Sequence, residues 1–141
     1  MSVVTGLVSC AAAARPEVAG LRNAMTVDVE DYFQVEAFAD RISRTSWDGI
    51  PRRVEANVDR LLELFAAAGV KATFFVLGWL AERHKEMVRR IAAADHEVAS
   101  HGYDHRRADR LDPPGFREDV RRAKRILEEI AARPVSGYRA P

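Results

Sequence analysis

The chain has 141 residues, of which 48% are apolar and 30% charged, with a formal net charge of +1 and a single cysteine, Cys10. This apolar content excludes an intrinsically disordered chain. The near-neutral charge argues against a nucleic-acid-binding protein, and one cysteine excludes an intramolecular disulfide. No apolar run reaches the roughly 18 residues that a transmembrane segment needs. We therefore expect a soluble globular domain.

The amino-terminal segment is small and apolar but lacks the features of a secretion signal. No Lys or Arg precedes Arg15, and Thr5 and Gly6 interrupt the apolar run. We therefore expect no signal peptide, which favours a cytoplasmic protein. Residues 1–20 are predicted to form a disordered leader, and residues 21–141 the domain.

The first half of the domain alternates β-prone runs with helical patterns. Residues 24–29 predict a strand, and an irregular stretch over 31–51 follows it. Apolar residues at helical spacing then predict a helix that has Pro51 in its first turn and ends at Gly69. Residues 70–77, which are rich in Val and Phe, predict a second strand.

The same alternation continues to the end of the chain. Residues 79–94 predict a helix with a break near His84, and 96–100 predict a third strand. The proline pair at 113–114 begins another helix, and 134–138 predict a fourth strand. Strands separated by helices of this length predict an α/β fold with a parallel sheet, whose active site lies at the carboxyl ends of the strands.

Two histidines and three acids follow the predicted strands. His101 and His105 come four residues apart after the third strand, so a short helical turn would let both imidazoles reach one ion. The alternative is a pair of solvated loop histidines. Zn²⁺ accepts two imidazoles and one carboxylate. The acids that follow the first strand are Asp28, Glu30 and Asp31.

The roles of the acids stay open at this point. Asp28 and Glu30 point to the same side of an extended strand, whereas Asp31 does so only if the chain turns, so either Glu30 or Asp31 can be the metal ligand. Acids after a strand also cap turns and helices. Arg139, after the fourth strand, either orients a carboxylate or is a surface charge.

Other polar residues receive structural interpretations. His84 is interpreted as a solvated helix residue and His96 as a loop residue that enters a strand. The charges of the last helix, Asp119 among them, form an exposed face linked by salt bridges.

Four segments together resemble a known family. They are 26–33 (TVDVEDYF), 73–78 (TFFVLG), 96–105 (HEVASHGYDH) and 137–141 (GYRAP). In this order they resemble the polysaccharide deacetylases with a NodB homology domain (carbohydrate esterase family 4), of the type encoded beside exosortase and exopolysaccharide export systems. The resemblance implies a partial (β/α) barrel with about four βα units. The family's later motifs, which include a histidine expected to protonate the leaving amine, are absent from these 141 residues, so the sequence is similar to the first half of such an enzyme.

The resemblance also implies roles for the polar residues at the strand ends. Asp28 is implied as the general base that activates a metal-bound water, and Arg139 as the residue that orients Asp28. The cofactor is a divalent metal, Zn²⁺ or else Co²⁺. Its implied ligands are His101, His105 and one of the pair Glu30 and Asp31.

The implied function is the hydrolytic removal of N-acetyl groups from an amino-sugar polysaccharide, without a nucleic-acid partner. The alternative is a truncated, non-catalytic metal- or sugar-binding remnant of such an enzyme. A metal-dependent phosphoesterase would explain the histidine pair but not the other motifs. The open barrel edge predicts an oligomer or aggregation. Asp95 stands where the family usually has glycine, which predicts a strained turn.

Overall fold

Three parallel strands form the sheet, in the order β1-β2-β3. The computed structural model describes residues 23–141, so the predicted leader and the predicted start of the domain at residue 21 lie outside the described residues. In the part of the chain that is described, no helix is long and apolar enough to cross a membrane. The strands are β1 (Met25–Val29), β2 (Ala72–Val76) and β3 (Glu97–Ser100). The α/β class and the parallel sheet are confirmed.

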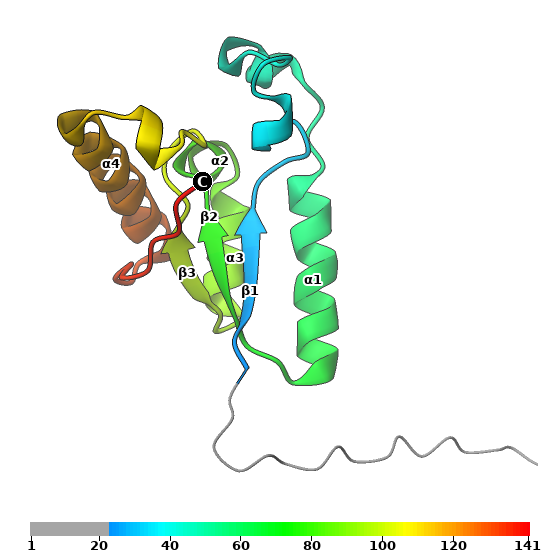
Figure 1. The fold of residues 1–141 in the computed structure, drawn as a ribbon. Coiled ribbons are helices and arrows are strands. Elements are labelled where there is room, and N and C mark those ends of the chain that lie inside the picture. Colours follow the sequence, from blue (N-terminus) through cyan, green and yellow to red (C-terminus); the bar gives the residue numbers. More distant parts are fainter. Residues whose placement is uncertain (1–22) are drawn as a thin grey trace, which may run out of the picture.

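Helices connect the strands and follow the last one. The α-helices are α1 (Val54–Ala68), α2 (Gly78–Arg83), α3 (Lys85–Ala93) and α4 (Pro113–Ala131). Three short 3-10 helices lie in the loops: η1 (Glu36–Phe38), η2 (Arg44–Gly49) and η3 (Ala108–Arg110). Figure 1 shows α1 alongside β1 and α4 beyond β3, with the carboxyl ends of all three strands pointing the same way.

Local sequence signals correctly predicted most of the helix boundaries that we expected. Gly69 ends α1 in the left-handed conformation, with φ +63°, and the predicted break at His84 separates α2 from α3. Pro51 lies outside α1, because Val54 is the first helical residue. His84 is not solvated, since its half-buried ring places Nδ1 3.1 Å from Oε2 of Glu55. The interpretation of His84 as a solvated helix residue was therefore wrong.

The fourth strand is reduced to one bridge. Tyr138 pairs in parallel with Ser100, whose N–H donates to the Gly137 carbonyl at 2.9 Å. The Arg139 N–H donates to the Ser100 carbonyl, also at 2.9 Å. The prediction of a strand over 134–138 was wrong in extent, because among these residues only Tyr138 forms a bridge to β3. The single bridge still brings Arg139 to the carboxyl edge of the sheet.

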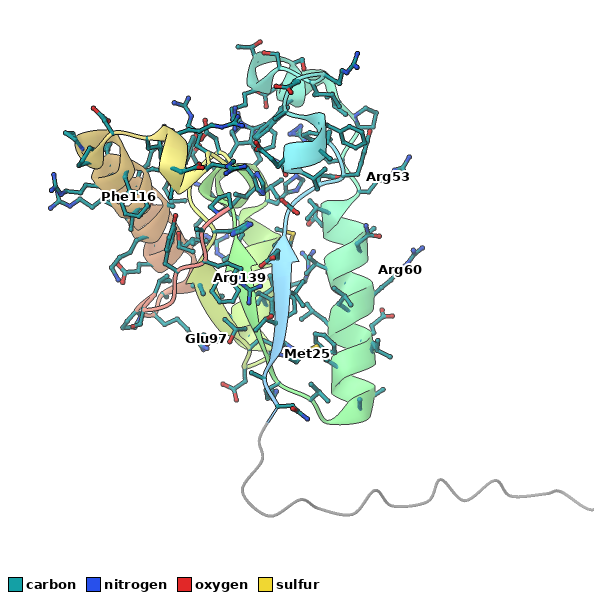
Figure 2. The ribbon with its side chains drawn as sticks, viewed as in Figure 1. Met25, Arg53, Arg60, Glu97, Phe116 and Arg139 are labelled. Carbon is teal, nitrogen blue, oxygen red and sulfur yellow. The ribbon has the colours of Figure 1, made fainter. Side chains whose placement is uncertain are left out.

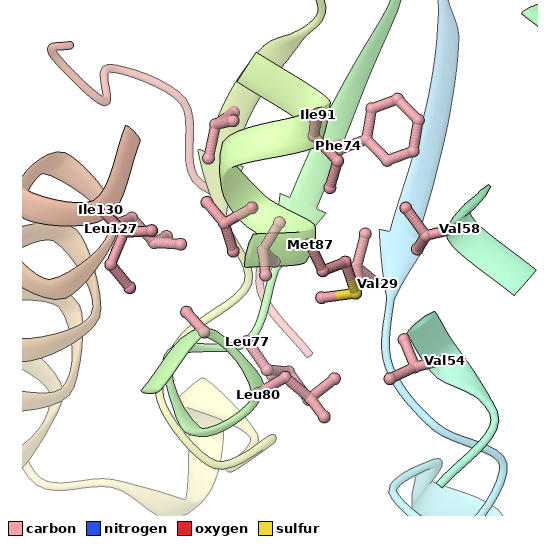
Figure 3. Close-up of a cluster of buried hydrophobic side chains, with 14 of the residues drawn as sticks. Val29, Val54, Val58, Phe74, Leu77, Leu80, Met87, Ile91, Leu127 and Ile130 are labelled. Carbon is pink, nitrogen blue, oxygen red and sulfur yellow. The ribbon is translucent and has the colours of Figure 1, made fainter. Parts of the chain in front are cut away.

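The two faces of the sheet differ in chemistry. One face packs against the helices and forms the apolar core, part of which Figure 3 shows. Its strand residues include Val29, Phe74, Val76 and Val98. Because side chains alternate along a strand, the intervening residues lie on the opposite face. These are Thr26, Asp28, Thr73, Phe75, Glu97 and Ala99. Asp28, a candidate site residue, therefore lies on the more polar face of the sheet.

His96 belongs to the core. Its ring is 3% exposed and lies 5.1 Å from the ring of Phe74, measured between centroids. Nδ1 accepts a hydrogen bond of 3.1 Å from the Ala72 N–H, which ties the start of β2 to β3. Burial and the positive charge of Lys71 lower the pKa of His96, against an opposing contribution from Asp95. His96 directly precedes β3, as the interpretation as a loop residue entering a strand implied, but its ring is also part of the core. Asp95 itself has φ +59°, which confirms the expected strain of this turn.

The lowered pKa of His96 predicts that acid destabilises the fold. Below about pH 6.5 the unfolded chain binds a proton that the folded chain resists, so the free energy of unfolding should fall as the pH decreases through this range. Urea unfolding at pH 7.5 and pH 5.5 measures this loss. A His96→Asn variant, which keeps a hydrogen-bond acceptor but does not titrate, should lose less stability over the same interval. An equal loss in both proteins would contradict the prediction.

Candidate metal centre

Among the described residues, Glu30, His101 and His105 form a group that could hold a metal ion. One ligand atom from each lies within 4.8 Å of the others. The centroids of the two imidazole rings are 5.3 Å apart, and His105 Nε2 lies 2.8 Å from Glu30 Oε2. Glu30 directly follows β1 and His101 directly follows β3. The carboxyl ends of the parallel strands therefore bring the three side chains together.

The hydrogen bonding of this group fits a cation. Glu30 Oε2 is buried and makes no hydrogen bond of acceptable geometry, although His105 Nε2 is so near. His101 Nδ1 lies 3.0 Å from the carbonyl oxygen of Arg139, which can only accept. Nδ1 therefore carries the hydrogen, and Nε2 keeps its lone pair. Two imidazoles and one carboxylate, with further positions open, are a donor set that suits Zn²⁺.

Burial also favours the neutral form of one imidazole. Burial lowers the pKa of His101, despite the hydrogen bond to the Arg139 carbonyl and the negative charge of Asp28. A neutral imidazole can donate its lone pair to a metal, whereas an imidazolium cannot.

The two histidines meet through an irregular loop and not through a helical turn. His105 has φ +56° and Gly102 has φ +75°, both in the left-handed region. The φ of position 102 favours glycine, and a Cβ there would also lie 2.9 Å from Oδ2 of Asp119. The expected helical i, i+4 geometry was therefore wrong, although both rings still reach one region.

Backbone groups of this loop are held by two helices. At the start of α2, the Gly78 N–H donates to the Gly102 carbonyl at 2.9 Å, and the Trp79 N–H donates to the Tyr103 carbonyl at 2.8 Å. From α4, the Asp119 carboxylate accepts the Tyr103 N–H at 3.1 Å. Asp119 is half-buried, so this carboxyl does not lie on an exposed face, and its burial raises its pKa. Sequence reasoning missed its role, because its spacing on α4 is that of a surface charge.

Asp31 points away from the histidines and caps a helix. Asp31 is only 2% exposed. Its Oδ2 accepts hydrogen bonds from the N–H groups of Arg53 at 2.7 Å and Val54 at 3.1 Å. Its Oδ1 accepts the Tyr32 N–H at 3.0 Å. Backbone donors thus engage both oxygens, Oδ2 at the start of α1 and Oδ1 in the loop after β1. Of the two acids left open by the sequence, the structure brings only Glu30 to the histidines.

Asp28 lies beside the candidate centre in an ion pair with Arg139. Arg139 Nη1 donates to Asp28 Oδ1 at 2.5 Å, and Nη2 donates to Thr26 Oγ1 at 2.9 Å. The guanidinium carbon lies 4.1 Å from the centroid of the Phe75 ring, in a cation–π contact. Figure 2 shows Arg139 over the sheet, between its two edges. Because the Arg139 carbonyl also contacts His101, this one residue touches both an acid and a histidine of the site.

Comparisons with known proteins point to one family. A family model of polysaccharide deacetylases matches residues 39–141. A peptidoglycan deacetylase of Helicobacter pylori is 29% identical over 102 residues, which cover 72% of this chain and 33% of the relative. A chitooligosaccharide deacetylase of Bradyrhizobium is 32% identical over 82 residues, which cover 57% of this chain and 37% of the relative.

A solved structure has the same fold over most of the chain. It belongs to a Mycobacterium smegmatis protein assigned to the polysaccharide deacetylases, and the TM-score is 0.64 at 40% identity. The match covers 84% of this chain and 42% of that one. This chain spans about a third of the length of the curated relatives it matches. The residues that the family model matches include His101, His105 and Arg139. Asp28, Glu30 and Asp31 precede the matched range.

The geometry predicts different effects for the two neighbouring acids. Glu30→Gln should weaken zinc binding at least about tenfold, because it removes a ligand charge. Asp31→Ala should leave zinc affinity unchanged but lower the free energy of unfolding by about 1–3 kcal/mol, because two N–H groups of α1 lose their acceptor. Zinc titration and urea unfolding of both variants measure these effects. Loss of zinc binding in Asp31→Ala with wild-type affinity in Glu30→Gln would reverse the assignment.

Proposed function

The chain belongs to the polysaccharide deacetylase family, and from this premise we propose that it is a metal-dependent hydrolase that removes N-acetyl groups from an amino-sugar polysaccharide. The observation that carries the proposal is the convergence of Glu30, His101 and His105 at the carboxyl edge of the sheet. The Asp28–Arg139 ion pair lies next to this group.

We propose that Glu30, His101 and His105 hold the metal. Their nitrogen and oxygen donors favour Zn²⁺, with Co²⁺ as the second candidate. A dication held there would supply two effects, a lower pKa of a water molecule and polarisation of the acetyl carbonyl. The hydrogen bond between His101 Nδ1 and the Arg139 carbonyl supports this role, since it leaves the lone pair of Nε2 on the same ring free to bind a metal.

Asp28 is proposed as the general base. Its carboxylate accepts the proton of the attacking water as the oxygen adds to the acetyl carbonyl. The C–N bond then breaks as the nitrogen takes up the proton held on Asp28 and the proton of the added hydroxyl, so that the products are acetate and a protonated primary amine, and Asp28 is again a carboxylate. Arg139 holds the Asp28 carboxylate in position through the 2.5 Å hydrogen bond, and its own position is fixed by Thr26 and Phe75.

The proposed substrate is an acetylated amino-sugar polymer. The curated relatives are a peptidoglycan deacetylase and a chitooligosaccharide deacetylase, and an N-acetylated amino sugar is common to those two substrates. Within this class we propose an exopolysaccharide, on the likeness of the 26–33 segment to deacetylases encoded beside export systems. Acetate release from an exopolysaccharide, from peptidoglycan and from chitooligosaccharides, measured side by side, tests this choice.

The proposed metal centre predicts that the chain binds about one Zn²⁺ per molecule. A His101→Ala/His105→Ala double variant should lose this binding, because two of the three ligands are gone. Equilibrium dialysis with zinc analysis measures the stoichiometry. The matched control is His84→Ala, which removes a histidine outside the centre and should bind zinc as the wild type does. Equal zinc uptake by the double variant would rule out this centre.

The proposed base predicts that Asp28→Asn separates binding from turnover. The variant should keep zinc affinity and lose acetate release by a factor of about 10² or more, because general-base catalysis contributes at this level. Asp40→Asn, which changes an exposed acid, should retain activity. Retained turnover in Asp28→Asn would remove the assignment. Zinc binding by the wild type without acetate release from any of the three polymers would favour the non-catalytic alternative.

A further inference from the structure

We propose that Arg44 is a positioning residue, which holds the carbonyl groups of Asp104 and His105 and thereby sets the His105 imidazole for a divalent cation. The inference rests on the proposed function, because it concerns a ligand of the proposed metal centre. Neither the motifs nor the spacing of residues in the sequence indicate Arg44.

The Arg44 guanidinium binds two consecutive backbone carbonyls at once, a contact that we call the fork. Arg44 Nε donates to the Asp104 carbonyl at 2.8 Å, and Nη2 donates to the His105 carbonyl, also at 2.8 Å. Nε further lies 3.8 Å from Oδ2 of Asp104. A planar guanidinium with donors in a fixed arrangement can bind two acceptors at once, which a flexible ammonium group does less well. Arg44 therefore restrains the orientation of two adjoining peptide groups.

This restraint acts where the loop is strained. His105 has φ +56°, a conformation that costs a residue with a Cβ on the order of 1 kcal/mol or more. The α2 amides hold the carbonyls of Gly102 and Tyr103, in the first half of the loop. Arg44 holds the carbonyls in the second half. The imidazole of His105, which is 8% exposed, projects from this second half toward Glu30.

Arg44 is itself held in place by a packed 3-10 helix. It is the first residue of η2, whose N-cap Ser43 accepts the Thr45 N–H through Oγ. Trp47 of η2 is 3% exposed and lies 5.2 Å from the ring of Trp79, measured between centroids. The Arg44 guanidinium also lies 5.8 Å from the centroid of the Trp47 ring. The connection between β1 and α1 thus reaches across to the loop after β3.

Arg44 acts through His105 and not as a metal ligand. A guanidinium stays protonated and has no lone pair to offer a cation. Its positive charge faces two carbonyl oxygens and the Asp104 carboxylate. Residues that orient a ligand in this way commonly change metal affinity by about 10- to 100-fold when they are removed.

The test is the zinc dissociation constant of the full chain without substrate, measured by competition with a chelator. Arg44→Ala should bind zinc about tenfold more weakly than the wild type. The matched control is Arg110→Ala. Arg110 lines the same cavity of about 240 Å³ as Arg44, but its ion-pair partner is Glu36. The control removes an equal charge without removing the fork and should keep wild-type affinity.

Two results would overturn the inference. Wild-type zinc affinity in Arg44→Ala would show that the fork does not position His105, even if the thermal stability of the metal-free protein falls. An equal loss in Arg110→Ala would show that zinc affinity falls without any loss of the fork, since removing a positive charge by itself should not weaken the binding of a cation. If Arg44→Ala does not fold, Arg44→Lys replaces it, since lysine keeps the charge and not the fork. Weaker binding by Arg44→Lys supports the inference, and wild-type binding contradicts it.

The double histidine variant separates this inference from the proposed function. If His101→Ala/His105→Ala keeps zinc, the metal centre itself is wrong. If that variant loses zinc while Arg44→Ala binds it as the wild type does, the centre stands and only the role of Arg44 is wrong.

Discussion

The backbone between His101 and His105 needs hydrogen-bond partners that no strand or helix of its own supplies, because an unpaired polar group is costly to bury. Two carbonyls of this loop accept from the first residues of α2, and the Tyr103 N–H is accepted by Asp119 of α4. Arg44, in the connection between β1 and α1, donates to the next two carbonyls. Three elements that are separate in sequence therefore hold the loop, and the apolar core holds those elements together. The position of the histidines depends on the packing of the whole described domain.

Neighbouring acids take different roles because the chain turns after β1. Glu30 points to the histidines, while Asp31 points to the start of α1 and accepts from two of its N–H groups. Arg139 connects two parts of the site, the proposed base and a proposed metal ligand. Its side chain binds Asp28, which is 111 residues away, and its carbonyl contacts His101. One bridge between Ser100 and Tyr138 is enough to bring this residue to the carboxyl edge of the sheet. The proposed base and a proposed metal ligand are thus tied to the same residue.

Sequence patterns predicted the elements that depend on near neighbours. Glycine at the end of α1, the break at His84 and proline at the start of α4 are signals read within one or two turns of chain. The same reasoning failed where a distant partner decides the outcome. The run at 134–138 has strand-forming residues but meets only the end of β3. Asp119 has the spacing of a surface charge but faces the Tyr103 amide. His96 has the sequence context of a loop, yet its ring lies against Phe74 in the core.

The amino-acid sequence by itself determined the α/β class, the order of strands and helices, and the presence of imidazoles and carboxylates at the strand ends. These properties follow from local periodicity and capping, which each segment carries without its neighbours in space. Only the tertiary structure decided which acid joins the histidines, that Asp119 accepts the Tyr103 N–H, and that Arg44 binds the carbonyls of the loop at His105. The physical reason is that a side chain's partner is chosen by which backbone groups and charges the packed core brings within hydrogen-bond distance, and spacing along the chain does not contain that information.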